Sequence, residues 1–204
     1  MLMQGLYVIT DASVTQPEQL YRQIQETIEG GAAYIQMRHK GNDLGLLEAL
    51  ADAAIDICRT KGKPCIINDH VLIARSLGAE GVHLGQNDES LINARKALGP
   101  SAIIGGTCHD STQLMERAVR EGATYCAFGR LFRSETKPTA NGLSLSKLSE
   151  LVEACPIPVV AIGGINADNA NQVLDTGVSM LAVSGAVFKS KDIGEAARRL
   201  SELL

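Results

Sequence analysis

Short apolar runs rich in β-branched residues alternate along the chain with longer stretches in which apolar residues recur at helical spacing. The short runs have the length of buried strands, and the longer stretches have the period of amphipathic helices. The predicted strands cover residues 6–10, 34–38, 64–68, 81–85, 102–107, 125–129, 158–164 and 180–185. The predicted helices cover residues 16–30, 44–61, 70–77, 89–98, 111–121 and 145–154, and one more follows each of the last two strands.

The junctions between these elements predict how the strands are arranged. No hairpin signal joins any two strands, and a glycine ends several helices before the next strand, at Gly31, Gly78, Gly122 and Gly177. A doubly wound open sheet is the alternative, but no Gly-x-Gly-x-x-Gly sequence follows the first strand. We therefore predict a single α/β domain over residues 1–204, a (β/α)8 TIM barrel with its active site at the C-terminal ends of the strands.

Composition and charge narrow the classes of function. The 204 residues carry a net charge of −4, no basic run, no Trp and 3% aromatic residues, which argues against nucleic acid as a partner. No apolar run approaches the ~20 residues of a membrane-spanning helix, and the N-terminal residues show neither a basic region nor a cleavage site, so we expect a cytoplasmic protein. The five cysteines form no Cys-x-x-Cys pair, which favours reduced thiols over a zinc site.

The end of the seventh predicted strand has the features of a phosphate-binding turn. An apolar run ends in Gly163 and Gly164, and Asn166 is placed to cap the helix that follows. Glycines leave backbone amides open to a ligand, and a helix N-terminus carries partial positive charge. A helix-capping turn without a ligand is the alternative. The eighth strand also ends in small residues, Ser184 and Gly185, and these two strand ends commonly bind phosphate in such barrels.

Polar side chains alternate at the end of the second strand. Gln36, Arg38 and Lys40 share one face, because Met37 and His39 stand between them and strand side chains alternate with a period of two. Two cations and an amide that converge on the barrel mouth suit a polyanion such as diphosphate. The alternative is that the two cations extend to solvent.

Two aspartates follow the third and fourth strands. Asp69 comes directly after Asn68 at the end of the third strand, and Asp88 lies just past the fourth. Either could cap a helix. Together, on adjacent units, they predict a Mg2+ site, because Mg2+ binds one or two carboxylates and completes its shell with phosphate oxygens and water.

The fifth and sixth strand ends supply further candidates. Thr107 offers a hydroxyl to the mouth, whereas His109 is better explained as a capping or solvent-facing residue than as a general base. The loop over residues 129–142 is the longest irregular segment and is typical of a functional lid. Its Ser134, Thr136 and Lys137 provide two hydroxyls and a cation for an anionic substrate.

Five stretches of the sequence resemble the thiamine phosphate synthase family, and the resemblance runs along nearly the whole chain. They are residues 36–40 (QMRHK), 67–69 (IND), 81–88 (GVHLGQND), 134–137 (SETK) and 161–165 (AIGGI). Each is weak by itself, but together they stand in order at the predicted strand ends. The family joins a hydroxymethylpyrimidine diphosphate to a thiazole phosphate, or to its carboxylated form, and releases diphosphate and thiamine monophosphate.

The resemblance implies a role for each candidate residue. The pyrimidine diphosphate would be bound by Gln36, Met37, Arg38, His39, Lys40, Asn68, Thr107 and Lys137. The thiazole phosphate would be bound by Ser134, Glu135, Thr136, Gly164, Val183 and Ser184. Mg2+ would be bound by Asp69 and Asp88, and the residues with a part in catalysis would be Arg38, Lys40, Thr107 and Lys137.

Two other functions are compatible with the barrel. A thiazole tautomerase would share the thiazole phosphate pocket, and a non-catalytic barrel could bind thiazole phosphate as a sensor or carrier. Thr136, Lys137 and Asp88 favour the synthase, because the first alternative typically lacks them and the second would lose the metal and diphosphate groups. The family usually has Pro where this chain has Arg130 and Arg133, which leaves the shape of the long loop open. Oligomeric state and the preferred thiazole form are also left open.

The reaction that we expect proceeds by ionisation. No Cys, Ser or His stands in an arrangement that would activate it as a covalent nucleophile. The leaving diphosphate is attached to a CH2 on an electron-rich aminopyrimidine, which can share the positive charge left behind. Cations placed in advance around the diphosphate would then stabilise the charge that develops on it.

Overall fold

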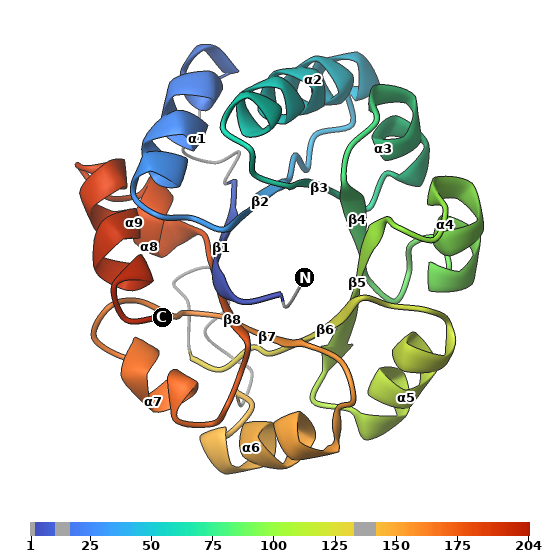
Figure 1. Cartoon of the computed structure of the whole chain (residues 1–204), viewed down its shortest axis with the longest axis vertical. Coiled ribbons are helices and arrows are strands. Elements are labelled where there is room, and N and C mark those ends of the chain that lie inside the picture. Colours follow the sequence, from blue (N-terminus) through green and yellow to red (C-terminus); the bar gives the residue numbers. More distant parts are fainter. Residues whose placement is uncertain (1–2, 11–16, 133–141) are drawn as a thin grey trace.

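Eight parallel strands close into a barrel in which each strand pairs with its neighbours in sequence and β8 pairs with β1 (Figure 1). The computed structural model describes residues 3–10, 17–132 and 142–204. The strands are β1 (Gly5–Ile9), β2 (Tyr34–Met37), β3 (Cys65–Asn68), β4 (Gly81–Leu84), β5 (Ile103–His109), β6 (Tyr125–Phe128), β7 (Val159–Ile162) and β8 (Met180–Val183). The predicted (β/α)8 barrel is thereby confirmed.

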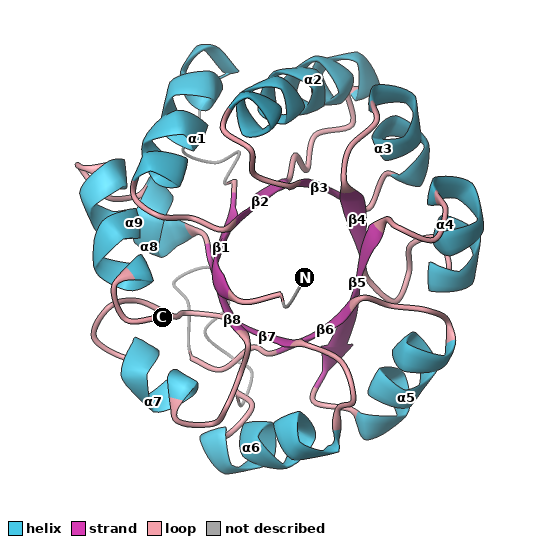
Figure 2. Cartoon of the chain, in the orientation of Figure 1, coloured by secondary structure: helices cyan, strands magenta, loops and turns pink. Residues whose placement is uncertain are grey.

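Helices surround the barrel as an outer ring (Figure 2). They are α1 (Leu20–Glu29), which follows the 3-10 helix η1 (Pro17–Gln19), α2 (Leu44–Thr60), α3 (Val71–Leu77), α4 (Leu91–Leu98), α5 (Thr112–Arg120), α6 (Leu145–Ala154), α7 (Ala170–Leu174), α8 (Gly185–Phe188) and α9 (Ile193–Ser201). The ring closes where α9 lies beside α1, and there Ser201 Oγ donates to the carbonyl of Gly30 at 2.7 Å (Figure 1).

The helix boundaries follow from capping chemistry. Five helices, α2, α4, α5, α6 and α9, begin with an N-cap side chain that accepts a backbone N–H of the first turn. These N-cap residues are Asp43, Ser90, Ser111, Ser144 and Asp192. The four glycines that were predicted to end helices all have positive φ, between 70° and 103°. Such a conformation is easy for glycine and strained for other residues, so each glycine turns the chain back toward the next strand.

Two apolar layers hold the fold together. Outward-facing strand residues such as Val8, Ile35 and Met37 pack with the helices in the larger core. Inward-facing residues such as Tyr7, Tyr34 and Tyr125 form a smaller core inside the barrel. Met3 and Met180 belong to this inner core and fill the N-terminal end of the barrel. Open space inside the barrel is therefore confined to the C-terminal strand ends.

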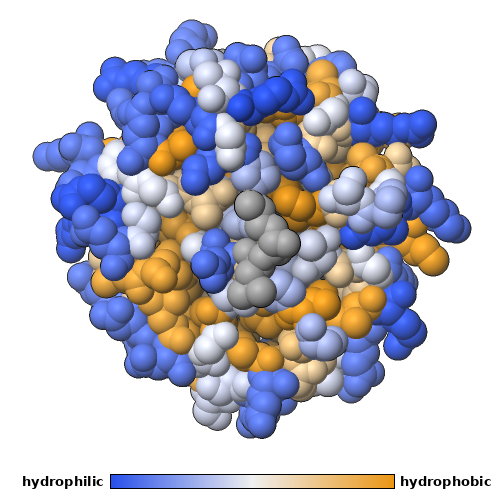
Figure 3. Space-filling model, in the orientation of Figure 1, coloured by the Kyte–Doolittle hydropathy of each residue, from blue (hydrophilic) through white to orange (hydrophobic). Residues whose placement is uncertain are grey.

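The outer surface is polar and carries local ion pairs. Hydrophilic residues occupy most of the periphery of the face shown in Figure 3. Pairs such as Arg22–Glu26 at 2.7 Å and Lys61–Glu29 at 2.8 Å join residues on or between helices, and pairs as exposed as these contribute little to stability. Among the residues that the structure describes, no helix is long and apolar enough to cross a lipid bilayer.

Candidate active site

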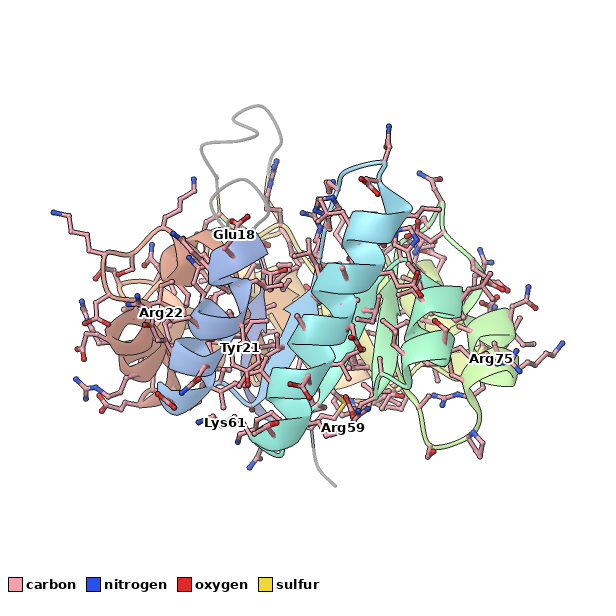
Figure 4. All side chains as sticks on the ribbon, turned by 90° about the horizontal axis from the view of Figure 1, so that it is seen from above. Glu18, Tyr21, Arg22, Arg59, Lys61 and Arg75 are labelled. Carbon is pink, nitrogen blue, oxygen red and sulfur yellow. The ribbon has the colours of Figure 1, made fainter. Side chains whose placement is uncertain are left out.

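Residues from all eight strands, or from the loops that follow them, line a single cavity of about 870 Å³. It lies at the end of the barrel where the strands finish and the helices begin. In the side view of Figure 4, Glu18 marks that end, whereas Arg59 and Lys61, at the close of α2, mark the opposite end. The predicted location of the active site agrees with the position of this cavity.

The end of β2 presents its polar side chains to the cavity as the alternation predicted. Gln36, Arg38 and Lys40 line the cavity. Met37 points the other way, into the core between barrel and helices, so it has only its main chain to offer a ligand. His39 is partly exposed and does not line the cavity. Thr10 fixes the strand end, because its hydroxyl accepts the backbone N–H of Arg38 at 2.8 Å.

Asp69 and Asp88 meet at the ends of β3 and β4. Their carboxyl groups are in hydrogen-bonding contact, and burial followed by the proximity of Asp88 raises the pKa of Asp69 to about 6. Neither aspartate caps a helix: Asp88 accepts the N–H of Gly85 at 2.7 Å, and α4 is capped by Ser90 instead. The alternative explanation of the two aspartates as helix caps is therefore wrong.

This pair of carboxylates fits a divalent cation. Two acidic groups in contact repel each other unless a proton or a cation lies between them. Within the described residues, no cluster of three or more His, Cys, Asp or Glu side chains is arranged to bind a metal. Two carboxylates are a set that Mg2+ can use, because phosphate oxygens and water can complete its coordination shell.

The floor of the cavity is a chain of hydrogen bonds between neutral side chains. Gln36 Nε2 donates to Tyr7 Oη at 3.0 Å, and the hydroxyls of Tyr7 and Tyr125 lie 2.8 Å apart. His83 Nδ1 lies 2.9 Å from Tyr125 Oη, and His83 Nε2 lies 2.9 Å from Thr107 Oγ1. Burial lowers the pKa of His83 to about 4 and raises the pKa of both tyrosines, so these groups are uncharged near pH 7.

Sequence reasoning missed three members of this floor: Tyr7, His83 and Tyr125. A signal was present, since His83 lies within the fourth of the apolar runs and interrupts it with a polar group. Its partners Thr107 and Tyr125 could not be deduced, because β5 and β6 supply them from distant parts of the chain.

The wall formed by β7 and β8 is built from main chain and small side chains. Gly163 and Ser184 line the cavity, and Gly163 and Gly164 have φ of 111° and 70°. A Cβ on Gly163 would lie 2.4 Å from Arg130 Cγ, so only glycine fits there. Val183 packs into the core between barrel and helices.

Asn166 makes the hydrogen bonds of an N-cap residue, as predicted, one turn before α7. Helix α7 begins later, at Ala170, and Asn169 holds its N-cap position. The Asn166 side chain accepts the N–H groups of Asp168 and Asn169 at 2.9 and 3.3 Å, and its carbonyl accepts the N–H of Ala170 at 3.0 Å. Asn169 Oδ1 accepts the N–H of Asn166 at 2.9 Å in return, which is the reciprocal pattern of a capping box.

The remaining candidates divide between the cavity and the undescribed loop. Thr107 lines the cavity, and so does His109, whose side chain is exposed and whose φ is 53°. Asn68 lines it beside Asp69. The candidates at 134, 135, 136 and 137 lie outside the described residues. Arg130, which sequence reasoning assigned no role, also lines the cavity.

Comparison with known proteins decides the family. The sequence profile of the family described as thiamine monophosphate synthase matches residues 6–187 of the chain. The chain belongs to the thiamine monophosphate synthase family. A thiamine-phosphate synthase from Nitrosococcus oceani is 44% identical over 195 residues, which are 96% of this chain and 90% of that protein.

Further thiamine monophosphate synthase relatives agree with this assignment. A thiamine-phosphate synthase from Methylococcus capsulatus is 43% identical over 202 residues, 98% of this chain and 89% of that protein. The solved structure of a thiamine phosphate pyrophosphorylase from Pyrococcus furiosus is 33% identical, with a TM-score of 0.88 over 98% of this chain and 95% of that one. The chain is accordingly an enzyme that joins a pyrimidine diphosphate to a thiazole phosphate to give thiamine monophosphate.

Proposed function

We propose that the two substrates of this reaction bind on opposite sides of the one cavity. The side formed by β2, β3 and β4 receives the pyrimidine diphosphate, and the side formed by β7 and β8 receives the thiazole phosphate. The observation that carries the proposal is the convergence of Arg38, Lys40 and Asp69 on a cavity whose other wall is glycine-rich, with Asp88 beside Asp69. A diphosphate needs cations and a metal, whereas a single phosphate can be bound by main-chain amides.

The diphosphate side would use charge and hydrogen bonds together. We assign Gln36, Asn68 and Thr107 to polar contacts with the pyrimidine diphosphate, and Arg38, Lys40 and Lys137 to its negative charge. His39 and the main chain of Met37 complete this stretch. Asp69 and Asp88 would hold Mg2+, which when bound supplies positive charge to the diphosphate oxygens.

The thiazole side would depend on shape. Gly164 and Ser184, with the main chain of Val183, would enclose the phosphate where strand ends and positive φ leave backbone amides accessible. Ser134, Glu135 and Thr136 would contact the thiazole. This arrangement directs the thiazole nitrogen toward the pyrimidine CH2 group in the middle of the cavity.

The chemistry that this site supports is ionisation followed by capture. In the described part of the chain, the cysteines are buried or packed against the core, and His83 is neutral and hydrogen-bonded at both nitrogens. None of these groups is placed to form a covalent intermediate. The cations instead stabilise the departing diphosphate, and the thiazole nitrogen attacks the resulting pyrimidine cation without a general base.

Release of diphosphate tests the proposal. The purified chain with both substrates and Mg2+ should release diphosphate and form thiamine monophosphate, and excess chelator should stop both. Electron-withdrawing groups on the pyrimidine should slow single turnovers steeply, because they destabilise the cation. Rates that do not respond to such groups would favour direct displacement by the thiazole nitrogen.

A further inference from the structure

The hydrogen-bond chain across the cavity floor links groups on opposite sides of the barrel. Gln36 on β2 and Thr107 on β5 are its two ends, and Tyr7, Tyr125 and His83 are its interior members. Both ends line the cavity, so each end has one partner inside the chain and one face toward a ligand. The four contacts measure between 2.8 and 3.0 Å, within the normal range of hydrogen bonds.

The direction of the chain follows from the Gln36 bond and from the need to pair every buried proton. Each tyrosine hydroxyl has one proton to donate, and a neutral imidazole donates from one nitrogen and accepts at the other. If Gln36 Nε2 donates to Tyr7 and each buried hydroxyl proton has an acceptor, Tyr7 donates to Tyr125 and Tyr125 to His83 Nδ1. His83 then carries its proton on Nε2 and donates it to Thr107.

Each end of the chain consequently presents a defined group to the cavity. The Thr107 hydroxyl accepts from His83, so its own proton remains available to donate to a ligand. Gln36 uses its NH2 group inside the chain, so its amide oxygen is left to accept. Reversal of any one bond would reverse all the others, and the two ends would then exchange roles: Gln36 would present NH2 and Thr107 a lone pair.

We propose that Tyr7, Tyr125 and His83 are positioning residues that couple the two ends, so that Gln36 is held as an acceptor and Thr107 as a donor toward the substrate. The proposal rests on the assignment of Gln36 and Thr107 to the pyrimidine diphosphate. An anionic diphosphate oxygen requires a donor at Thr107, and the chain then requires an acceptor at Gln36. The Gln36 amide oxygen can accept a hydrogen bond from the exocyclic amino group of the pyrimidine. An oxo group in place of that amino group would have no proton to donate and would be repelled.

The direction of the chain can be measured without turnover. The four histidines of the ligand-free protein are labelled with 15N, and His83 is assigned by comparison with His83→Gln. We expect the wild-type ring to carry its proton on Nε2. In Tyr125→Phe the donor to Nδ1 is lost, and both tautomers should be populated. A proton on Nδ1 in the wild type, or an unchanged tautomer in Tyr125→Phe, would overturn the proposal.

Tyr34→Phe is the matched control. Its ring stacks on Tyr7 with centroids 5.9 Å apart and belongs to the same inner core, but its hydroxyl is not a member of the chain. The His83 tautomer should be the same in Tyr34→Phe as in the wild type. If Tyr125→Phe does not fold, Tyr7→Phe interrupts the same chain one bond earlier and should also mix the tautomers.

Substrate discrimination provides the functional readout. Dissociation constants are measured for the 4-aminopyrimidine diphosphate and its 4-oxo counterpart, with Mg2+ and without the thiazole substrate. The wild type should prefer the amino compound, and Tyr125→Phe should reduce that preference roughly tenfold, since a released Gln36 amide can rotate to meet the oxo group. Tyr34→Phe should keep the full preference. Equal preference in wild type and Tyr125→Phe would contradict the coupling.

The two experiments separate this inference from the proposed function. A wild-type protein that released no diphosphate from the two substrates would refute the proposed function, whereas the His83 tautomer would still decide the direction of the chain. If the wild type is fully active, but the His83 tautomer and the substrate preference are unchanged in Tyr125→Phe, the proposed function stands and the coupling is refuted.

Discussion

In the proposed arrangement, the two sides of the cavity recognise anions by different means. On the side of β2, β3 and β4, the recognition groups would be side chains: Arg38, Lys40 and the pair Asp69 and Asp88. On the side of β7 and β8, the recognition surface is main chain, opened by glycines with positive φ. Charge dominates the first side and shape dominates the second.

This difference determines how each side can fail. A side-chain site loses one charge at a time, and its remaining groups keep their positions, because the strands beneath them pack through other residues. A main-chain site has no side chain to delete. A substitution can disrupt it only by placing a new side chain in the binding space or by straining the backbone. Substitutions on the two sides should therefore affect different substrates, and the predictions below use that separation.

The largest effect is expected on the charged side. Asp69→Ala or Asp88→Ala should lower kcat/KM for the pyrimidine diphosphate by about 3–4 kcal/mol, the scale of one lost preorganised group, because Mg2+ would lose half of its protein ligands. Affinity for thiazole phosphate, measured by calorimetry, should hardly change. Asp110→Ala removes another carboxylate that lines the cavity and serves as the control. Full activity of Asp88→Ala in excess chelator would contradict the metal assignment.

The main-chain side should respond to Gly164→Val. Gly164 has φ of 70°, where a β-branched residue is strained, and it follows Gly163, which lines the cavity. Thiazole phosphate should bind about 2 kcal/mol more weakly, whereas pyrimidine diphosphate binding should be unchanged. Gly177→Val imposes a similar strain at φ of 85° away from the cavity. If both variants bound thiazole phosphate equally well, Gly164 would not belong to the site.

The same contrast explains what the sequence could predict. The eight strands were found because each is a short apolar run that ends at a polar or glycine turn, and the predicted 34–38 differs from the observed Tyr34–Met37 by one residue. Gln36, Arg38 and Lys40 were found because alternation along one strand is a local property. Asp69 and Asp88 required only that adjacent strands lie side by side.

What the sequence could not predict depends on register between distant strands. Tyr7 and Tyr125 are separated by 118 positions, and their contact exists only after the barrel closes. Each tyrosine read alone is an ordinary core residue. The cap at Asn166 could be predicted, by contrast, because a cap residue and the amides that it binds lie within one turn of sequence.

Arg130 tests whether the main-chain side is free of charge effects. This arginine lines the cavity and packs against Gly163, on the side assigned to thiazole phosphate. Arg130→Ala should raise KM for thiazole phosphate, by the equivalent of about 1 kcal/mol of binding free energy, because a partly exposed cation contributes modestly to binding. The kcat should be nearly unchanged. Arg130→Lys, which keeps the charge, should recover part of the loss. Equal KM values for wild type, Arg130→Ala and Arg130→Lys would mean that Arg130 does not contribute to binding and that this side acts through its main chain alone.

The smallest effect concerns the stability of the charged side without metal. Burial, then the nearby Asp88, raises the pKa of Asp69 from its ordinary 3.8 to about 6, although His70 and Arg38 act in the opposite direction. The folded state therefore holds this proton more tightly than the unfolded state does. Its stabilising contribution is complete below about pH 4 and is lost as the pH rises through 6.

Thermal unfolding in chelator between pH 4 and 8 should reveal this loss as a difference between wild type and Asp69→Asn, since the amide does not titrate and other carboxyl groups contribute equally to both proteins. We expect about 1 kcal/mol, because the carboxyl is half exposed and solvent screens it. Asp88→Asn should reduce the difference without removing it, because burial is the larger cause.

Mg2+ at pH 8 should raise the wild-type midpoint and leave Asp69→Asn nearly unchanged, since only an ionised pair binds the cation well. Parallel pH curves for wild type and Asp69→Asn would mean that these two carboxylates do not compete for a shared proton, and the charged side would then lack the strained pair on which its metal binding depends.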